Sequence, residues 1–113
     1  MLPRPWRSAS RLSPLNYDLL PPEERRGYDR FLELATIEIT APLPIQRNYR
    51  FATYVKTDEE RSRMSAEWVR QHSREEVIAM TLETSWNTPH STTDGYRAVG
   101  SGLARTVAEY LAE

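Results

Sequence analysis

The first clear pattern of apolar and polar positions predicts an amphipathic helix over residues 22–35. Pro21 and Pro22 can begin it, because the fixed φ of proline suits the first turn and its missing N–H has no partner there. Apolar side chains then recur at helical spacing: Tyr28, Phe31, Leu32 and Ala35. We expect this face of the helix to pack against the core.

The next stretch is expected to contain little helix. The sequence Thr-Ile-Glu-Ile-Thr at residues 36–40 alternates as a short strand does, and it also fits the fraying end of the preceding helix. Pro42 and Pro44 then break regular structure, since neither can donate a backbone hydrogen bond. Residues 48–56 are rich in aromatic and β-branched side chains, which favours a strand or an extended loop.

A second helix is predicted over residues 57–72. Thr57 and Glu60 have the spacing of a capping box, in which the hydroxyl and the carboxylate each satisfy a free backbone N–H at the helix start. Apolar residues at helical spacing follow and mark the face that is expected to point inward: Met64, Trp68 and Val69.

The apolar run at residues 77–82 admits two interpretations. Ser73 and Glu76 have capping-box spacing, which would make residues 74–86 a helix. A parallel strand that is covered on both faces also reads as a continuous apolar run, which would make residues 77–83 a buried strand. Periodicity cannot decide between the two.

The chain closes with a predicted helix over residues 94–112, after a polar, turn-rich loop at residues 87–93. Gly100 and Gly102 lack a side chain, so another element can approach the middle of this helix closely there. The inner stripe of the helix is expected to consist of Tyr96, Val99, Leu103, Val107, Tyr110 and Leu111.

Composition and charge argue against several classes of protein. The 113 residues suffice for one domain, and 39% of them are hydrophobic, which predicts a modest core. The 15 basic and 16 acidic residues leave a net charge of -1, so the overall field does not favour nucleic acid as a partner. No apolar run is long enough to span a membrane, and we expect a cytoplasmic protein. Without cysteine, a metal ion would need His, Asp or Glu as ligands.

Candidate metal ligands are few. His72 and Glu75 form an H-x-x-E pair, and this spacing on a helix can aim both side chains at one zinc ion. No third ligand follows in a recognisable frame, so a solvated helix end explains the pair better. A metal protein that uses His72, Glu75 and His90 is the least favoured function.

Glu83 is the most informative candidate for catalysis. An acidic residue directly after an apolar run would lie at the carboxyl end of a strand, where α/β sheets place ligands and catalytic groups. A partly buried carboxylate there can serve as a general base. On residue chemistry alone, an ordinary carboxylate that pairs with an arginine is the commoner case. No Ser/His/Asp set and no glycine-rich phosphate loop accompanies Glu83.

Three consecutive segments near the C-terminus carry a resemblance to a known family. They are a Thr-Leu-Glu motif at residues 81–83 behind the apolar run, a loop at residues 84–93, and a closing helix with the pattern Y-R-A-V-G-x-G-L-A-R. This order resembles the C-terminal part of the zinc carboxypeptidase-like metallopeptidases. Together with the Ala-Pro-Leu-Pro sequence at residues 41–44 and the helix before the strand, the resemblance covers about three quarters of the chain.

The resemblance implies a role for two residues. In that family the glutamate of the motif acts as general base and acid, since it activates a zinc-bound water and then protonates the leaving amine. Glu83 is the matching position, and residues 77–83 then form a central strand. Tyr54 is the candidate counterpart of a mobile tyrosine that contacts substrate. The parent family's zinc cofactor and peptide-like substrate follow from the same resemblance.

The resemblance also implies that the chain is incomplete. The family's zinc ligands all precede the glutamate strand, whereas the first histidine here, His72, lies only 11 residues before Glu83. We therefore expect no metal site in this chain, and an α/β fold that is an incomplete α/β/α piece with a short parallel or mixed sheet. Residues 1–20 are expected to form an irregular leader with arginines and prolines, and residues 21–113 a single partial domain.

A truncated hydrolase fragment that is inactive alone is thus the first functional hypothesis. A lone parallel strand leaves backbone groups unsatisfied, so the fragment is expected to associate with a separate N-terminal half or with itself. The alternative is a small helical protein-interaction module without catalysis, in which residues 74–86 form a helix and Glu83 is a surface residue.

Overall fold

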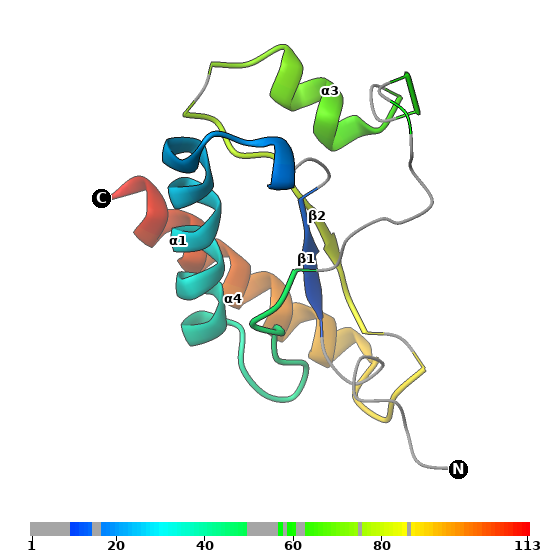
Figure 1. Cartoon of the computed structure of the whole chain (residues 1–113). Coiled ribbons are helices and arrows are strands. Elements are labelled where there is room, and N and C mark those ends of the chain that lie inside the picture. The colour runs from blue at the N-terminus through cyan, green and yellow to red at the C-terminus, as the bar shows by residue number, and fades with distance from the viewer. Residues whose placement is uncertain are drawn as a thin grey trace.

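The computed structural model describes residues 10–14, 17–49, 57, 59–60, 63–74, 76–85 and 87–113. The elements in chain order are β1 (Arg11–Ser13), the 3-10 turn η2 (Tyr17–Leu19), α1 (Pro22–Glu38), α3 (Ser65–Gln71), β2 (Thr81–Glu83) and α4 (Thr93–Leu111). Helices α1 and α4 pack against each other beside the two strands, and α3 lies beyond the end of the sheet (Figure 1). The protein is therefore mixed α/β, as the sequence predicts.

The sheet joins two segments that are far apart in the sequence. Strands β1 and β2 are antiparallel, and their register aligns Arg11 with Glu83 and Leu12 with Leu82. One residue before β1, Ser10 forms a parallel bridge with Ile45. Both backbone groups of Ser10 are bonded there, because its N–H donates to the Pro44 carbonyl at 2.9 Å and its carbonyl accepts from the Gln46 N–H at 2.7 Å.

The predicted buried parallel strand over residues 77–83 is not observed: the prediction is wrong in the extent, the direction and the burial of the strand. Only residues 81–83 form a ladder, they run antiparallel to β1, and all of residues 77–83 are half-buried or exposed. The helical interpretation of residues 74–86 is also wrong, since none of the described residues in that range is helical. The apolar run instead packs Ile78 and Met80 against the core from an irregular segment.

The N-terminal region contributes to the core, although the sequence predicts an irregular leader over residues 1–20. Residues 11–13 form β1 and residues 17–19 form η2 within that range. Leu12 and Leu20 are buried, and Leu12 belongs to the central apolar cluster. The difference arises because β1 finds its hydrogen-bonding partner in β2, which no local pattern near residue 11 indicates.

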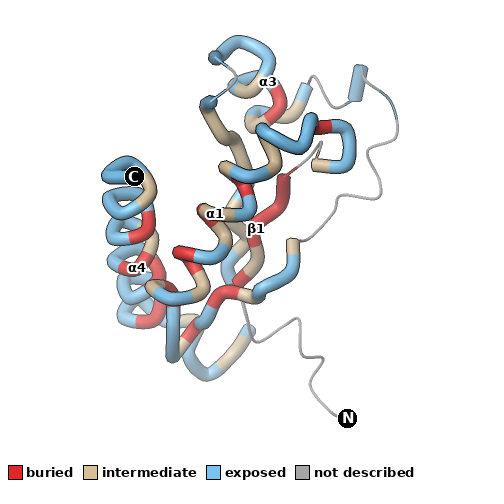
Figure 2. The backbone as a smooth tube through the Cα atoms, turned by 60° about the vertical axis from the view of Figure 1, so that its left-hand side comes forward, coloured by how far each residue is buried: buried red, intermediate tan, exposed pale blue. Residues whose placement is uncertain are grey.

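The core lies where α1, α4 and β1 meet. Figure 2 shows that the buried positions of α4 lie on the side that faces the rest of the molecule. Its central cluster consists of Leu12, Phe31, Ala35, Ile39, Leu43, Ile45 and Val99.

Helix α1 extends to Glu38, so residues 36–40 are mainly the helix end and not a strand. In a strand Ile37 and Ile39 would share a face, but Ile37 is 61% exposed whereas Ile39 is buried. Ile39 lies one helical turn after Ala35, and its N–H donates to the Ala35 carbonyl at 2.8 Å. The helical interpretation is confirmed, because it places Ala35 and Ile39, one turn apart, together in the core.

The helix predicted over residues 57–72 is interrupted. The N–H of Glu60 donates to Thr57 Oγ1 at 3.1 Å, as the capping box predicts, and residues 59–60 are helical. Met64, however, has an extended backbone with φ -81° and ψ 137°, and α3 begins only after it. The two helical pieces are therefore separate, and the predicted continuous helix is wrong.

Helix α4 has nearly the predicted length but buries a different face. Val99 is buried as expected, whereas the expected inner residues Tyr96, Val107 and Leu111 are exposed. Leu103 and Tyr110, also expected inside, are half-buried. The buried positions of the helix are Gly95, Val99, Gly102 and Thr106.

Of Gly100 and Gly102, the two glycines at which the sequence predicts a close approach, only Gly102 has one. A Cβ atom there would lie 2.6 Å from the carbonyl oxygen of Glu38 and 3.0 Å from Ile39 Cγ1, so the end of α1 passes directly over this glycine. A Cβ atom at Gly100 would have nothing within 4 Å. The small residue thus determines where the two helices cross.

Two exposed ion pairs connect α4 and the C-terminus to α1. Arg30 Nε lies 2.8 Å from Glu113 Oε1, and Arg105 Nε lies 2.8 Å from Glu38 Oε2. Hydrogen bonds from the arginines lower the pKa of Glu113 and of Glu38. Because the pKa of Glu113 is lowered, its pair with Arg30 supports the fold above the ordinary glutamate range and loses that effect as the pH falls through the lowered pKa.

We expect Gly102→Ala to lower the free energy of unfolding by about 1–3 kcal/mol, because the added methyl group forces α1 and α4 apart. Gly100→Ala is the matched control in the same helix. It should raise the free energy of unfolding by about 0.5–1 kcal/mol through helix propensity alone. Urea unfolding followed by circular dichroism measures both. Equal effects of the two substitutions would contradict the crossing at Gly102.

Candidate functional site

Glu83 is the last residue of β2 and lies at the start of the loop that leads to α4. Its side chain is half-buried. The register of the strand pair places it opposite Arg11, and opposite charges at facing positions of antiparallel strands attract each other. The position agrees with the predicted carboxylate at a strand end. It also agrees with the simpler interpretation, in which such a carboxylate accompanies an arginine.

The loop after Glu83 is anchored to α4. The hydroxyl of Tyr96 donates to the Ser85 carbonyl at 3.0 Å. Asn87 has φ 60°, a left-handed conformation that asparagine adopts more readily than most residues. Thr92 caps α4 by accepting a hydrogen bond from a first-turn N–H at 3.1 Å. These contacts hold the backbone on the C-terminal side of Glu83.

The histidines lie on the surface and do not converge. His72 ends α3, its Nδ1 lies 2.8 Å from the Trp68 carbonyl oxygen, and its ring stacks on the Trp68 ring with centroids 4.2 Å apart. His90 is exposed in the loop before α4, and Glu75 lies outside the described residues. In the part of the chain that the structure describes, no group of three or more His, Asp or Glu residues could hold a metal ion.

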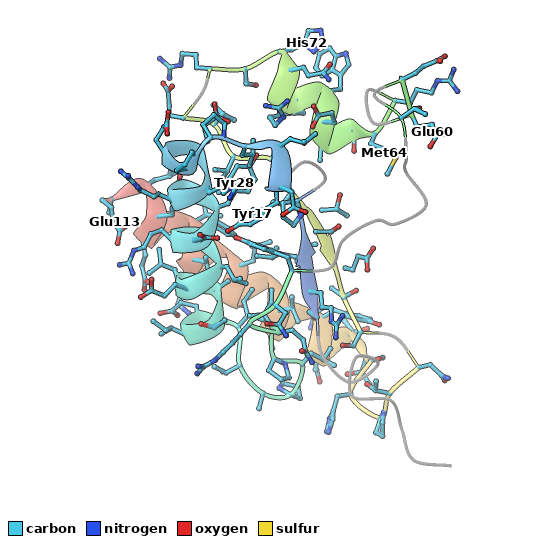
Figure 3. The ribbon with its side chains drawn as sticks, in the orientation of Figure 1. Tyr17, Tyr28, Glu60, Met64, His72 and Glu113 are labelled. Atoms are coloured by element: carbon cyan, nitrogen blue, oxygen red, sulfur yellow. The ribbon has the colours of Figure 1, made fainter. Side chains whose placement is uncertain are left out.

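The predicted substrate contact Tyr54 lies outside the described residues. Among the described regions that the sequence singles out, the structure brings together only Glu83 and the loop before α4, and it adds Arg11, which the sequence does not single out. Figure 3 shows His72 at the top of α3 in this view, well away from the strands.

A buried carboxylate in α3 was not indicated by the hydrophobic pattern. Glu67 is 2% exposed, whereas Trp68, which the pattern places inward, is 55% exposed. Glu67 accepts hydrogen bonds from Arg70 Nη2 at 2.9 Å and from Gln71 Nε2 at 3.0 Å. The signal in the sequence is the spacing of three and four residues between the carboxylate and its two donors, which brings them to one side of a helix.

Tyr28 lies near this carboxylate and joins α1 to the segment before β2. Its hydroxyl accepts a hydrogen bond from the Ala79 N–H at 3.2 Å. Burial raises the pKa of the Tyr28 phenol above its ordinary value, and the hydrogen bond from Ala79 and then the charge of Arg70 oppose that shift. The phenol is therefore protonated at neutral pH, which suits a structural role and not that of a base.

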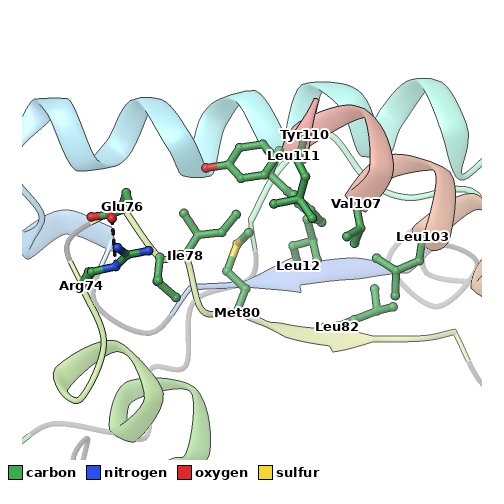
Figure 4. Close-up of a pocket in the computed structure, with 12 residues that line it drawn as sticks. Leu12, Arg74, Glu76, Ile78, Met80, Leu82, Leu103, Val107, Tyr110 and Leu111 are labelled. Carbon is green, nitrogen blue, oxygen red and sulfur yellow. Dashed lines mark ion pairs between the residues drawn. The ribbon is translucent and has the colours of Figure 1, made fainter. Parts of the chain in front are cut away.

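An apolar pocket of about 520 Å³ lies between the strands, the segment before β2, and α4 (Figure 4). Its charged residues are Arg74 and Glu76, whose Nε and Oε1 atoms are 3.1 Å apart. Glu83 does not line it. The apolar walls come from segments far apart in the sequence, which is why no single pattern predicts the pocket. Those walls include Leu12, Ile78, Met80, Leu82, Leu103, Val107 and Leu111.

Comparison with known proteins finds no matching family model, no matching curated protein and no matching solved structure. The relation to zinc carboxypeptidase-like metallopeptidases therefore stays a prediction from the motifs. Among the helices that the structure describes, none has the length and apolar character needed to cross a membrane.

We expect Glu67→Ala to lower the free energy of unfolding by about 1–3 kcal/mol, because the buried carboxylate and the charge-assisted hydrogen bonds that it accepts from the half-buried Arg70 and the exposed Gln71 are lost. Glu59→Ala is the matched control, since Glu59 pairs with Arg63 at an exposed position. Its effect should stay within about 0.5 kcal/mol. Urea unfolding compares the two. A loss at Glu67 no larger than the loss at Glu59 would contradict the buried cluster.

Proposed function

We propose that the chain is the C-terminal portion of a zinc carboxypeptidase-like hydrolase, with Glu83 as general base and acid in the hydrolysis of a peptide or amide bond. One observation carries the proposal: Glu83 ends a strand, and an anchored loop and a closing helix follow it. This is the order that the motif implies. A half-buried carboxylate at a strand end is held in place and is still accessible to water, as a general base requires.

The contacts around the loop support the same role. A catalytic side chain must be held close to its productive position by the residues around it. β1 holds the backbone of Glu83 on one side through the strand pairing, and Tyr96 holds the backbone at Ser85 through its hydrogen bond. Both attachments fix the backbone position from which the Glu83 side chain extends.

The described residues do not fit a zinc site, because they contain no cluster of ligands. The proposal therefore assigns the metal ligands, and the groups that bind the substrate's carboxylate, to a separate N-terminal half. Glu83 contributes proton transfer only. In the complete hydrolase the sheet would extend into an α/β/α arrangement with parallel strands. A cytoplasmic location belongs to the same proposal.

The alternative function, a helical interaction module, is less well supported. It requires residues 74–86 to be helical, and the described residues of that range are not.

The test is reconstitution with the zinc-binding N-terminal half of a bacterial zinc carboxypeptidase-like hydrolase, expressed as a separate chain. We expect association, and hydrolysis of a chromogenic peptide substrate by the complex but not by this chain alone. Glu83→Gln should lower that hydrolysis by about 100-fold or more, because proton transfer by a positioned group contributes roughly 10²–10⁴-fold. Glu33→Gln, at an exposed position of α1, should leave the rate unchanged.

Three results would contradict the proposal. The first is failure of the two halves to associate. The second is a complex that is inactive, or one whose activity is equal with Glu83→Gln. The third is hydrolysis by this chain alone that survives both chelation and Glu83→Gln.

A further inference from the structure

The apolar pocket has charge at one end only. Figure 4 shows Arg74 and Glu76 at one end, with Met80 and Leu12 toward the middle and Leu103 at the other end. Tyr110 also lines the pocket, but its hydroxyl points toward α1, where a Cβ atom at Gly27 would lie only 2.9 Å away. The pocket is thus an apolar groove with an ion pair at one end.

The volume lies in the range of small-molecule sites. Such pockets span about 300–1,000 Å³. The pocket of about 520 Å³ falls in that range. Its wall includes Leu111, which is 74% exposed, and the half-exposed Val107. An apolar ligand would remove this surface from water.

The Arg74 guanidinium at the charged end of the pocket can bind a ligand carboxylate. The side chains of Arg74 and Glu76 are 83% and 65% exposed, and an ion pair that exposed is weak. A ligand carboxylate can therefore replace Glu76 on the guanidinium, while Glu76 turns into water without becoming buried. Arginine suits this exchange because its planar fork binds a carboxylate through two parallel hydrogen bonds.

We propose that this pocket binds an aliphatic monocarboxylate, with its hydrocarbon chain along Met80, Leu103 and Val107 and its carboxylate on Arg74. The chemistry of the lining selects this class: an apolar groove favours a hydrocarbon chain, and Arg74, the one cationic side chain among the described residues that line it, favours one acidic head. The proposal does not rest on the hydrolase function, because Glu83 is not part of the pocket.

The probes are decanoate and decanol, titrated into the full chain by calorimetry at neutral pH. We expect saturable binding of one decanoate per chain, and weaker binding of decanol by a few-fold, about fivefold at most for an exposed charge pair. Arg74→Gln should remove the preference for decanoate over decanol. Arg97→Gln, on the exposed side of α4 and outside the pocket, should keep it.

The apolar wall of the pocket is tested at Leu111, because a substitution at this exposed position leaves the core intact. Leu111→Glu should weaken decanoate binding by about tenfold or more, because it adds a negative charge beside the hydrocarbon chain. Leu19→Glu is the matched control, since Leu19 is similarly exposed and lies outside the pocket. Circular dichroism establishes that both variants are folded.

Absence of decanoate binding would overturn the proposal, as would equal binding by Leu111→Glu and the wild-type chain. An acid preference that survives Arg74→Gln would overturn the role of the guanidinium. A wild-type dimer that becomes monomeric with Leu111→Glu, without decanoate binding, would assign the pocket to a second copy of the chain instead.

Discussion

The crossing of α1 over α4 at Gly102 is the contact on which the rest of the structure depends. It sets the position of α4, and the first turns of α4 hold the loop that follows β2 through Thr92 and Tyr96. From the other side, Tyr28 of α1 binds the backbone at Ala79, just before β2. The strand that carries Glu83 is therefore positioned at both ends by the two helices, and its ladder with β1 completes the attachment.

Helix α3 buries a paired carboxylate where the sequence pattern led us to expect apolar packing. The buried group of the helix is Glu67, whereas Trp68 faces outward and stacks on His72. A short helix that buries one paired carboxylate and little apolar surface has few contacts to lose when it opens. We therefore infer that α3 opens before the pair formed by α1 and α4 does, and that the surface near His72 contributes little to the position of Glu83.

Local signals in the sequence were enough to predict where the two long helices begin. Prolines at the start of α1 and the polar residue at the start of α4 act within one turn, so both helices begin within a residue of the prediction. The strands could not be predicted in the same way, because β1 and β2 stabilise each other across most of the chain. The rotation of α4 depends on which glycine α1 approaches, and spacing alone could not distinguish Gly100 from Gly102. The strand-end position of Glu83 was predictable, whereas its facing arginine was not.

Whether Glu83 ends a strand that is paired with β1 is tested most directly by the nuclear Overhauser contacts of the chain in solution. We expect contacts between the backbone protons of Leu12 and Leu82, because the two residues face each other in the antiparallel ladder. Those contacts would place Glu83 at the end of a paired strand. A series of strong sequential amide contacts through residues 77–83, as in a helix, with no contact between Leu12 and Leu82, would contradict it.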